Sequence, residues 1–200
     1  ASTLLFDQPV VIKNLPRVKD IETMISLLQS LGSKIIFSKD KRSVKIINKK
    51  KMKTFASYSI VKKMRGSFLV LGPLIAKYYN SKCSLPGGCN LGARPVNYHL
   101  QALKKLGMNY HLKDGYILGK SKGKLKGTKI NFPKISVGAT ENTIIAASLA
   151  KGETILKNCA IEPEIKDLTN FLNLAGAKIK CTGRTCNIIG VNSLKETEYS

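Results

Sequence analysis

The chain has 200 residues, 43% of them hydrophobic, which is enough for one substantial domain or two small ones and excludes a chain that is disordered as a whole. The longest apolar run, Phe68–Ala76, is interrupted by Gly72 and Pro73 and falls short of the roughly 20 residues that cross a bilayer, so we predict no membrane helix. The first residues lack the basic and apolar regions of a secretory signal. Because the chain starts with Ala1 rather than Met, we expect it to be trimmed or a fragment.

The formal net charge is +22, from 34 lysines and arginines against 12 acidic residues. Such a charge favours an anionic partner, which would be nucleic acid, a membrane surface or a phosphorylated substrate. A compositional bias that loads a solvated surface with lysine explains the same number, and the sequence leaves both interpretations open.

Five cysteines and two histidines occur, without a C-x-x-C pair. A zinc site needs paired ligands at tight spacing, so we predict no metal site. Five unpaired thiols fit a reducing, cytoplasmic compartment.

A pattern of apolar residues followed by a glycine recurs three times, about 70 residues apart. Apolar residues stand 11 and 4 positions before each glycine, and two of the three segments add one 7 positions before it. This spacing marks one face of a helix, and the glycine is the expected left-handed cap. The glycines are Gly32, Gly107 and Gly176.

Each of these helices is followed by a strand hairpin, and two units then carry a second helix, over residues 57–78 and 136–152. The sequence therefore predicts an α/β fold of three β-α-β-α-β-β units, with mixed sheets outside and helices packed inside. The units span about 8–80, 81–151 and 152–200, and the last lacks its second helix.

The glycine-rich loop at Ser84–His99 is longer than the repeat requires, and insertions at strand-to-helix junctions tend to carry function. Neighbouring cations and a helix start lower a thiol pKa, so Cys89 is a candidate nucleophile or proton donor; the alternative is a small, partly buried residue without chemistry. Arg94 and Pro95 at a helix start make a candidate anion site, and the alternative is an exposed charge.

Three further segments carry cations. Lys134–Thr140 opens the second apolar helix, where backbone N–H groups can bind phosphate, although Ser-x-Gly helix starts are also common caps. Arg65 interrupts an apolar stretch, which indicates either a cleft or a salt bridge. Gly119–Lys129 has no aromatic residues for base stacking, so we interpret it as a lysine-rich hairpin rather than a nucleic-acid tail.

The motifs "MRGSFLVLGPL", "SLPGGCNLGARPVNYHLQALKKLG", "KISVGATEN" and "EPEIKDLTNFLNLAGAKI" resemble the UDP-N-acetylglucosamine enolpyruvyl transferases (1-carboxyvinyltransferases), from about Gln8 to Gly190. The resemblance implies an inside-out α/β barrel of the enolpyruvyl transferase type, one of two similar domains. It also implies transfer of the enolpyruvyl group of phosphoenolpyruvate to the 3-hydroxyl of UDP-N-acetylglucosamine, with release of phosphate. This is the first committed step of peptidoglycan synthesis, and it needs no metal or organic cofactor.

By this resemblance, Cys89 is the general acid toward phosphoenolpyruvate, becomes covalently attached to it, and is alkylated by fosfomycin. Arg94 also lies near the phosphoenolpyruvate phosphate. The residues implied to bind the UDP-sugar are Arg65, Arg94, Pro95, Val96, Asn97, Tyr98, Lys134, Ile135, Ser136, Val137 and Gly138. The family usually has aspartate in place of Asn97 and leucine in place of Tyr98, so the nucleotide contacts there differ from the usual pattern.

Two parts of the family's site lie outside this chain. The Lys-Asn pair that meets phosphoenolpyruvate lies upstream, and Lys13-Asn14 is on a repeat strand and is not that pair. The second domain, which supplies the aspartate that deprotonates the sugar hydroxyl, is absent. We therefore expect residues 1–200 to be a single domain that is inactive alone and has that second domain as its partner.

Two alternatives are a basic nucleic-acid-binding protein and an inactive paralogue. A nucleic-acid binder would spread cations along one face with aromatic residues between them, whereas here arginines stand beside glycine-rich turns. The intact cysteine loop argues against an inactive paralogue.

Overall fold

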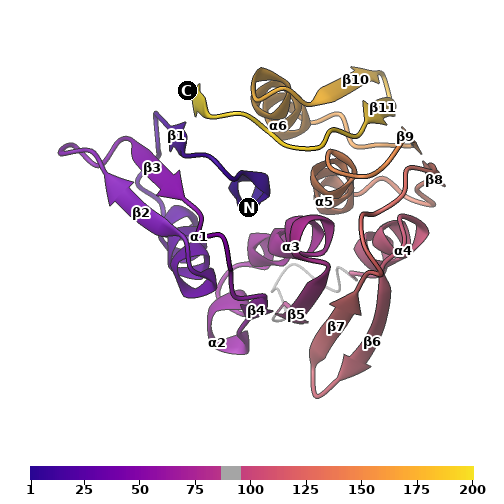
Figure 1. Cartoon of the computed structure of the whole chain (residues 1–200), viewed down its shortest axis with the longest axis horizontal. Helices are drawn as coiled ribbons and strands as arrows, with labels where there is room; N and C mark the ends of the chain where they lie inside the picture. The colour runs from indigo at the N-terminus through magenta and orange to yellow at the C-terminus, as the bar shows by residue number, and fades with distance from the viewer. Residues whose placement is uncertain (87–95) are drawn as a thin grey trace.

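The computed structural model describes residues 1–86 and 96–200, and it arranges them as three four-stranded sheets around internal helices (Figure 1). The first sheet has the order β12-β1-β3-β2: Thr197–Tyr199, Val10–Ile12, Val44–Ile47 and Lys34–Phe37. The second has the order β4-β5-β7-β6: Phe55–Ala56, Asn80–Ser84, Tyr116–Lys120 and Asn109–Lys113. The third has the order β10-β11-β9-β8: Lys178–Thr182, Thr185–Ile189, Glu153–Lys157 and Lys129–Asn131.

Each sheet combines one parallel pair with antiparallel pairs, as predicted for mixed sheets. The parallel pairs are β4 with β5, β8 with β9, and β12 with β1. Residues 55–120 and 129–189 each form one sheet in the order β-α-β-α-β-β predicted from the repeat, although these groups begin and end at other residues than the predicted units. The first sheet joins residues 10–47 with 197–199 from the other end of the chain. The limits of the domain itself stay a prediction.

The helices predicted from the recurring glycines are confirmed as α1 (Lys19–Leu31), α4 (Asn97–Lys105) and α6 (Pro163–Leu174). The glycine near each C-terminus has a left-handed backbone, with φ of 113° at Gly32, 111° at Gly107 and 96° at Gly176. A side chain is strained in this conformation, which explains why glycine stands at all three ends.

The centre of the fold is formed by α5 (Val137–Ala147) and α3 (Leu71–Tyr78), with the sheets outside them (Figure 1). From Ala139 to Ala147 every residue of α5 except Glu141 is buried. The two helices are in contact at Gly72, where a Cβ atom would lie 2.2 Å from Asn142 Oδ1. The predicted interior packing of this helix is thereby confirmed.

The single second helix expected over residues 57–78 is wrong. The chain forms α2 (Tyr58–Val61), a 3₁₀ helix η2 (Arg65–Val70) and then α3. Met64 has extended backbone angles, and Pro73 has no N–H to donate, so it fits only the first turn of a new helix. The break has a consequence for the site, because it sets Arg65 at the start of a separate helical segment.

The lysine-rich hairpin expected at Gly119–Lys129 is also wrong. Residues 121–128 connect β7 to β8, which belong to different sheets. Leu125 anchors the connection: its side chain is buried, and its carbonyl accepts a hydrogen bond from the Lys151 N–H at 2.7 Å.

Cys181 and Cys186 form a disulfide, so the expectation of five unpaired thiols is wrong for this pair. The two residues are direct partners in the β10–β11 hairpin, and side chains at opposite positions of an antiparallel pair lie close enough to join. Cys83 and Cys159 are free and buried.

A short 3₁₀ helix, η1 (Ser2–Leu5), precedes β1. Within residues 1–86 and 96–200, none of the helices has the length and apolar character to cross a membrane.

Candidate functional site

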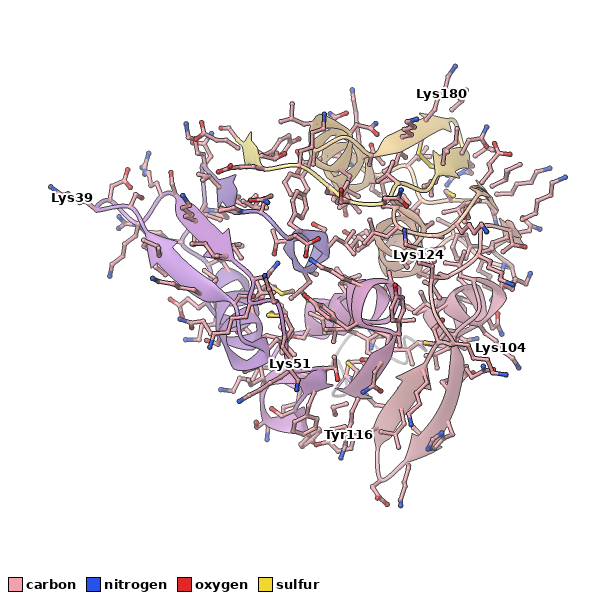
Figure 2. All side chains as sticks on the ribbon, viewed as in Figure 1. Lys39, Lys51, Lys104, Tyr116, Lys124 and Lys180 are labelled. Atoms are coloured by element: carbon pink, nitrogen blue, oxygen red, sulfur yellow. A yellow bond between two sulfur atoms is a disulfide. The ribbon has the colours of Figure 1, made fainter. Side chains whose placement is uncertain are left out.

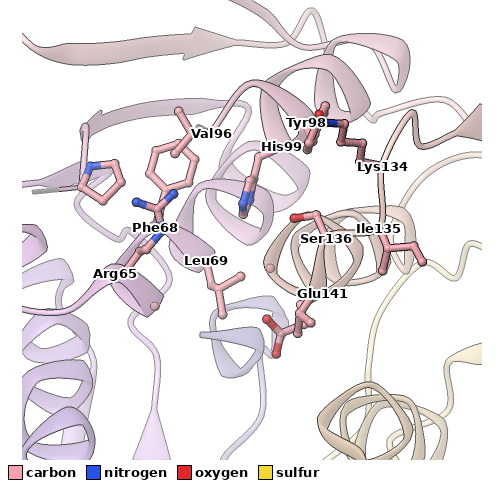
Figure 3. Close-up of a pocket in the computed structure, with 14 residues that line it drawn as sticks. Arg65, Phe68, Leu69, Val96, Tyr98, His99, Lys134, Ile135, Ser136 and Glu141 are labelled. Carbon is pink, nitrogen blue, oxygen red and sulfur yellow. The ribbon is translucent and has the colours of Figure 1, made fainter. Parts of the chain in front are cut away.

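A cavity of about 660 Å³ lies where η2, the start of α4 and the start of α5 meet (Figure 3). Its wall combines two cations with apolar side chains and one acid. The lining residues are Arg65, Gly66, Phe68, Leu69, Pro86, Val96, Tyr98, His99, Lys134, Ile135, Ser136, Val137, Gly138 and Glu141.

The cavity brings together most of the residues that the sequence singled out. Arg65, Val96, Tyr98 and all of Lys134–Gly138 line it, although the segments that carry them are far apart in the chain. Asn97 begins α4 and is not among the lining residues. The other sequence candidates, Cys89, Arg94 and Pro95, lie outside the described residues.

The N-terminus of α5 opens into this cavity. Ser136 is the N-cap, and its Oγ accepts a hydrogen bond from the Ala139 N–H at 3.3 Å. The first N–H groups of a helix have no acceptor within it, so those of Val137 and Gly138 remain as donors beside the cavity. The helix dipole places partial positive charge at the same point, which favours an anion there.

Arg65 and Lys134 add two full positive charges at different sides of the cavity (Figure 3). A guanidinium, an ammonium and helix N-terminal N–H groups around one cavity form a site suited to phosphate oxygens. The arrangement can therefore bind a ligand that carries a phosphate or diphosphate and has apolar parts that contact Val96, Tyr98 and Ile135.

His99 is a cavity residue that the sequence reasoning missed. It lies between Phe68 and Ser136, and its ring meets Phe68 edge-on at 5.3 Å between centroids (Figure 3). Burial, with Arg65 nearby, lowers the pKa of His99 to about 4. Its imidazole is therefore neutral at physiological pH. The sequence contained one signal: His99 is one of only two histidines, and it stands beside the apolar stripe of a predicted helix.

Glu141 was missed as well. Burial, together with the nearby Glu164, raises the pKa of its carboxyl to about 7, and the amine of Ala1 acts in the opposite direction. The cavity thus contains one acid that changes charge near neutral pH. The sequence alone did not indicate this raised pKa, because it does not show whether a glutamate on a largely apolar helix is exposed or buried.

The family model described as EPSP synthase (3-phosphoshikimate 1-carboxyvinyltransferase) matches residues 1–200. The chain belongs to this family. Three relatives, all named UDP-N-acetylglucosamine 1-carboxyvinyltransferase, come from Pelagibacter ubique (59% identical over the whole chain), Coxiella burnetii (44% over the whole chain) and Dinoroseobacter shibae (47% over 96% of it). The chain spans about half of each of them: 48%, 46% and 46% of their lengths.

Solved structures of the family have the same fold. The enolpyruvyl transferase NikO from Streptomyces tendae matches the whole chain and 47% of its own chain, with a TM-score of 0.84 at 17% identity. The EPSP synthase from Acinetobacter baumannii matches 98% of the chain and 46% of its own, with a TM-score of 0.77 at 18% identity. The predicted inside-out α/β barrel of the enolpyruvyl transferase family is confirmed.

Proposed function

We propose that this chain is the cysteine-loop domain of a UDP-N-acetylglucosamine 1-carboxyvinyltransferase. The enzyme would transfer the enolpyruvyl group of phosphoenolpyruvate to the 3-hydroxyl of UDP-N-acetylglucosamine and release phosphate, beginning peptidoglycan synthesis. A bond forms between the sugar oxygen and C2 of phosphoenolpyruvate, the bond from C2 to the phosphate oxygen breaks, and the hydroxyl proton leaves. Relatives at 44–59% identity that carry this name support the proposal.

The observation that carries it is the convergence of Arg65, Lys134 and the α5 N-terminus on one cavity. In our proposal these groups hold the diphosphate of the UDP-sugar, because they supply charge and N–H donors that are fixed before the ligand arrives. Val96, Tyr98 and Ile135 would contact the nucleotide or sugar, and Asn97 would offer an amide from the first turn of α4.

Cys89 is proposed as the general acid toward phosphoenolpyruvate, with Arg94 binding the phosphate of the same substrate. The second domain of the longer protein would supply the aspartate that accepts the hydroxyl proton. The proposed site uses no metal or organic cofactor. We place the enzyme in the cytoplasm by the same resemblance, since the Cys181–Cys186 disulfide removes the argument from unpaired thiols.

Calorimetric titration of the chain with UDP-N-acetylglucosamine tests the ligand class. We expect saturable binding that weakens about tenfold or more in Arg65→Ala and in Lys134→Ala, since each variant removes a charge-assisted hydrogen bond. Lys180→Ala, at an exposed position on β10, is the matched control for loss of one positive charge. Preference for 3-phosphoshikimate over the UDP-sugar would instead assign the chain to the other activity named in the family.

A further inference from the structure

The amide of Asn142 connects four elements and contacts two residues that line the cavity, Phe68 and His99. It is fully buried on α5, and its Oδ1 accepts a hydrogen bond from the Gly72 N–H at 2.7 Å, at the start of α3. Its Nδ2 lies 3.4 Å from the Phe68 carbonyl of η2 and 3.1 Å from Nδ1 of His99 on α4.

Two backbone groups fix which way this amide points. The Gly72 N–H can only donate, and the Phe68 carbonyl can only accept. If the amide were turned over, its NH₂ would face the N–H and its oxygen would face the carbonyl, and two hydrogen bonds would become repulsive contacts in a buried place. The orientation therefore follows from the backbone, and Nδ2 donates toward His99.

The orientation of the amide decides the protonation of the ring. An Nδ1 atom that receives a hydrogen bond from Nδ2 must be unprotonated, so the proton of the neutral imidazole resides on Nε2. The Nε2 edge of the ring faces α5: a Cβ atom at Gly138 would lie 3.4 Å from Nε2 and 3.1 Å from Cε1. His99 also lines the cavity, so this N–H lies beside the donors of the α5 N-terminus.

We propose that Asn142 is a positioning residue that holds His99 as the neutral Nε2–H tautomer, so that the ring presents one fixed N–H donor to the ligand. The ligand part rests on the proposed function, since the UDP-sugar is the anion that would receive this donor. The tautomer itself rests only on the hydrogen bonds among Asn142, Gly72, Phe68 and His99. Asn142 is not one of the residues that line the cavity, and in this proposal it acts only through His99.

The charged groups around His99 come from two directions. Arg65 faces it from η2, and Lys134 and Glu141 line the same cavity on the α5 side. A bound phosphate would favour an imidazolium, whereas the Nδ2 donor opposes a proton on Nδ1. Because Glu141 titrates near neutral pH in the same cavity, the test reads the ring nitrogens themselves rather than the pH dependence of affinity.

The experiment is nitrogen NMR of the 200-residue chain, in which the two histidines give two sets of ring signals, assigned with His111→Gln. In the unliganded chain we expect His99 to show a protonated Nε2 and an unprotonated Nδ1, unchanged between pH 7.5 and 5.5. A proton on Nδ1, an equal mixture of tautomers or an imidazolium at pH 5.5 would overturn the proposal. This measurement needs no ligand, so it stands even if the proposed substrate does not bind.

The variant is Asn142→Asp, which keeps the shape and the acceptor for the Gly72 N–H but replaces the donor facing Nδ1 with a carboxylate oxygen. We expect the His99 ring to become protonated on Nδ1 and UDP-N-acetylglucosamine to bind about tenfold more weakly. Thr143→Val, which removes the neighbouring buried hydroxyl that donates to the Ala139 carbonyl, is the matched control and should leave the tautomer unchanged. A variant that folds but keeps the wild-type ring signals contradicts the role of Asn142. If the variant does not fold, the wild-type tautomer still decides.

Discussion

The thiols of this chain differ in their surroundings. Burial raises the pKa of Cys83 to about 12 and that of Cys159 to about 11, and Cys181 and Cys186 are joined to each other. A thiolate is the reactive form, so the two buried free thiols are nearly inert at neutral pH.

We therefore predict that Cys89 is the cysteine alkylated first. Iodoacetamide at pH 7.5 followed by peptide mass spectrometry should show label at Cys89 well before Cys83 or Cys159. In the full-length enzyme fosfomycin should label the same residue, and Cys89→Ala should abolish that label. Faster modification of Cys159 would contradict the assignment of the reactive thiol.

Glu141 gives a prediction about pH. Its pKa is raised from the model-peptide value of 4.5 to about 7, so between these values the folded state binds more protons than the unfolded state. The carboxyl therefore makes stability fall as pH rises through this window. Glu141→Gln should raise the melting temperature at pH 8 relative to wild type and leave the difference small at pH 4.5. An equal shift at both pH values would show that ionisation is not the cause.

The elements show why part of the fold was predictable. The hairpins and the glycine-terminated helices follow from local rules, because glycine adopts a left-handed backbone without strain. A glycine such as Gly32 after an apolar helical stripe therefore predicts the end of a helix. The broken segment before α3 was not predictable in this way. Its buried apolar residues suit a continuous helix as well as three pieces. Pro73 limits where a new helix can begin, and the close packing of Gly72 against α5 fixes the position of that helix.

That contact predicts a large effect of a small change. In Gly72→Ala the new Cβ would lie 2.2 Å from Asn142 Oδ1 and 2.6 Å from the Asn142 carbonyl oxygen, so α3 and α5 must separate. We expect a loss of about 3 kcal/mol in the free energy of unfolding, measured with urea. Gly66→Ala is the control for stability, because the atoms nearest to its Cβ belong to the flexible Met64 side chain, at 3.7 Å and beyond. Equal losses in the two variants would show that the interhelical contact is not limiting.

At the scale of the whole molecule, the positive charge lies largely in water. Among the described residues three ion pairs form, involving Lys13, Lys19 and Lys77. Lys39, Lys104 and Lys180 project outward at different edges of the molecule rather than along one face (Figure 2). This distribution fits a solvated lysine surface better than a nucleic-acid groove.

Binding to nucleic acid should accordingly be weak and governed by counterion release. Fluorescence anisotropy with a labelled single strand should show affinity that falls steeply between 50 and 200 mM salt, by about 10³-fold or more if six or more phosphates are contacted. Salt-resistant or sequence-selective binding would revive the nucleic-acid alternative.

The candidate site was predictable where motif and chemistry coincide and unpredictable where burial decides. Arg65 and Lys134–Gly138 were recognised because a cation or a helix start stands out in sequence. His99 and Glu141 acquire their character from neighbours supplied by other elements, so their altered pKa values appear only when the elements have packed.

The chain alone should bind but not react. We predict no phosphate release from the 200 residues with phosphoenolpyruvate and UDP-N-acetylglucosamine, because the proposed base that accepts the sugar proton belongs to the second domain. A phosphate-release assay with the full-length enzyme is the positive control. Turnover by the chain that disappears in Cys89→Ser would refute the two-domain account.

The pairing of β1 with β12 determines how the domain responds to a mechanical pulling force. The strands run parallel, with Val10 opposite Thr197 and Ile12 opposite Tyr199, and the Lys13 N–H donates to the Tyr199 carbonyl at 2.7 Å. A pull on the chain before β1 and after β12 acts at opposite ends of this pair, so its hydrogen bonds are sheared together rather than unzipped one by one. When a domain that is connected through these strands moves, the whole sheet should move with it and its edge strand should stay paired. The domain should therefore resist stretching between β1 and β12.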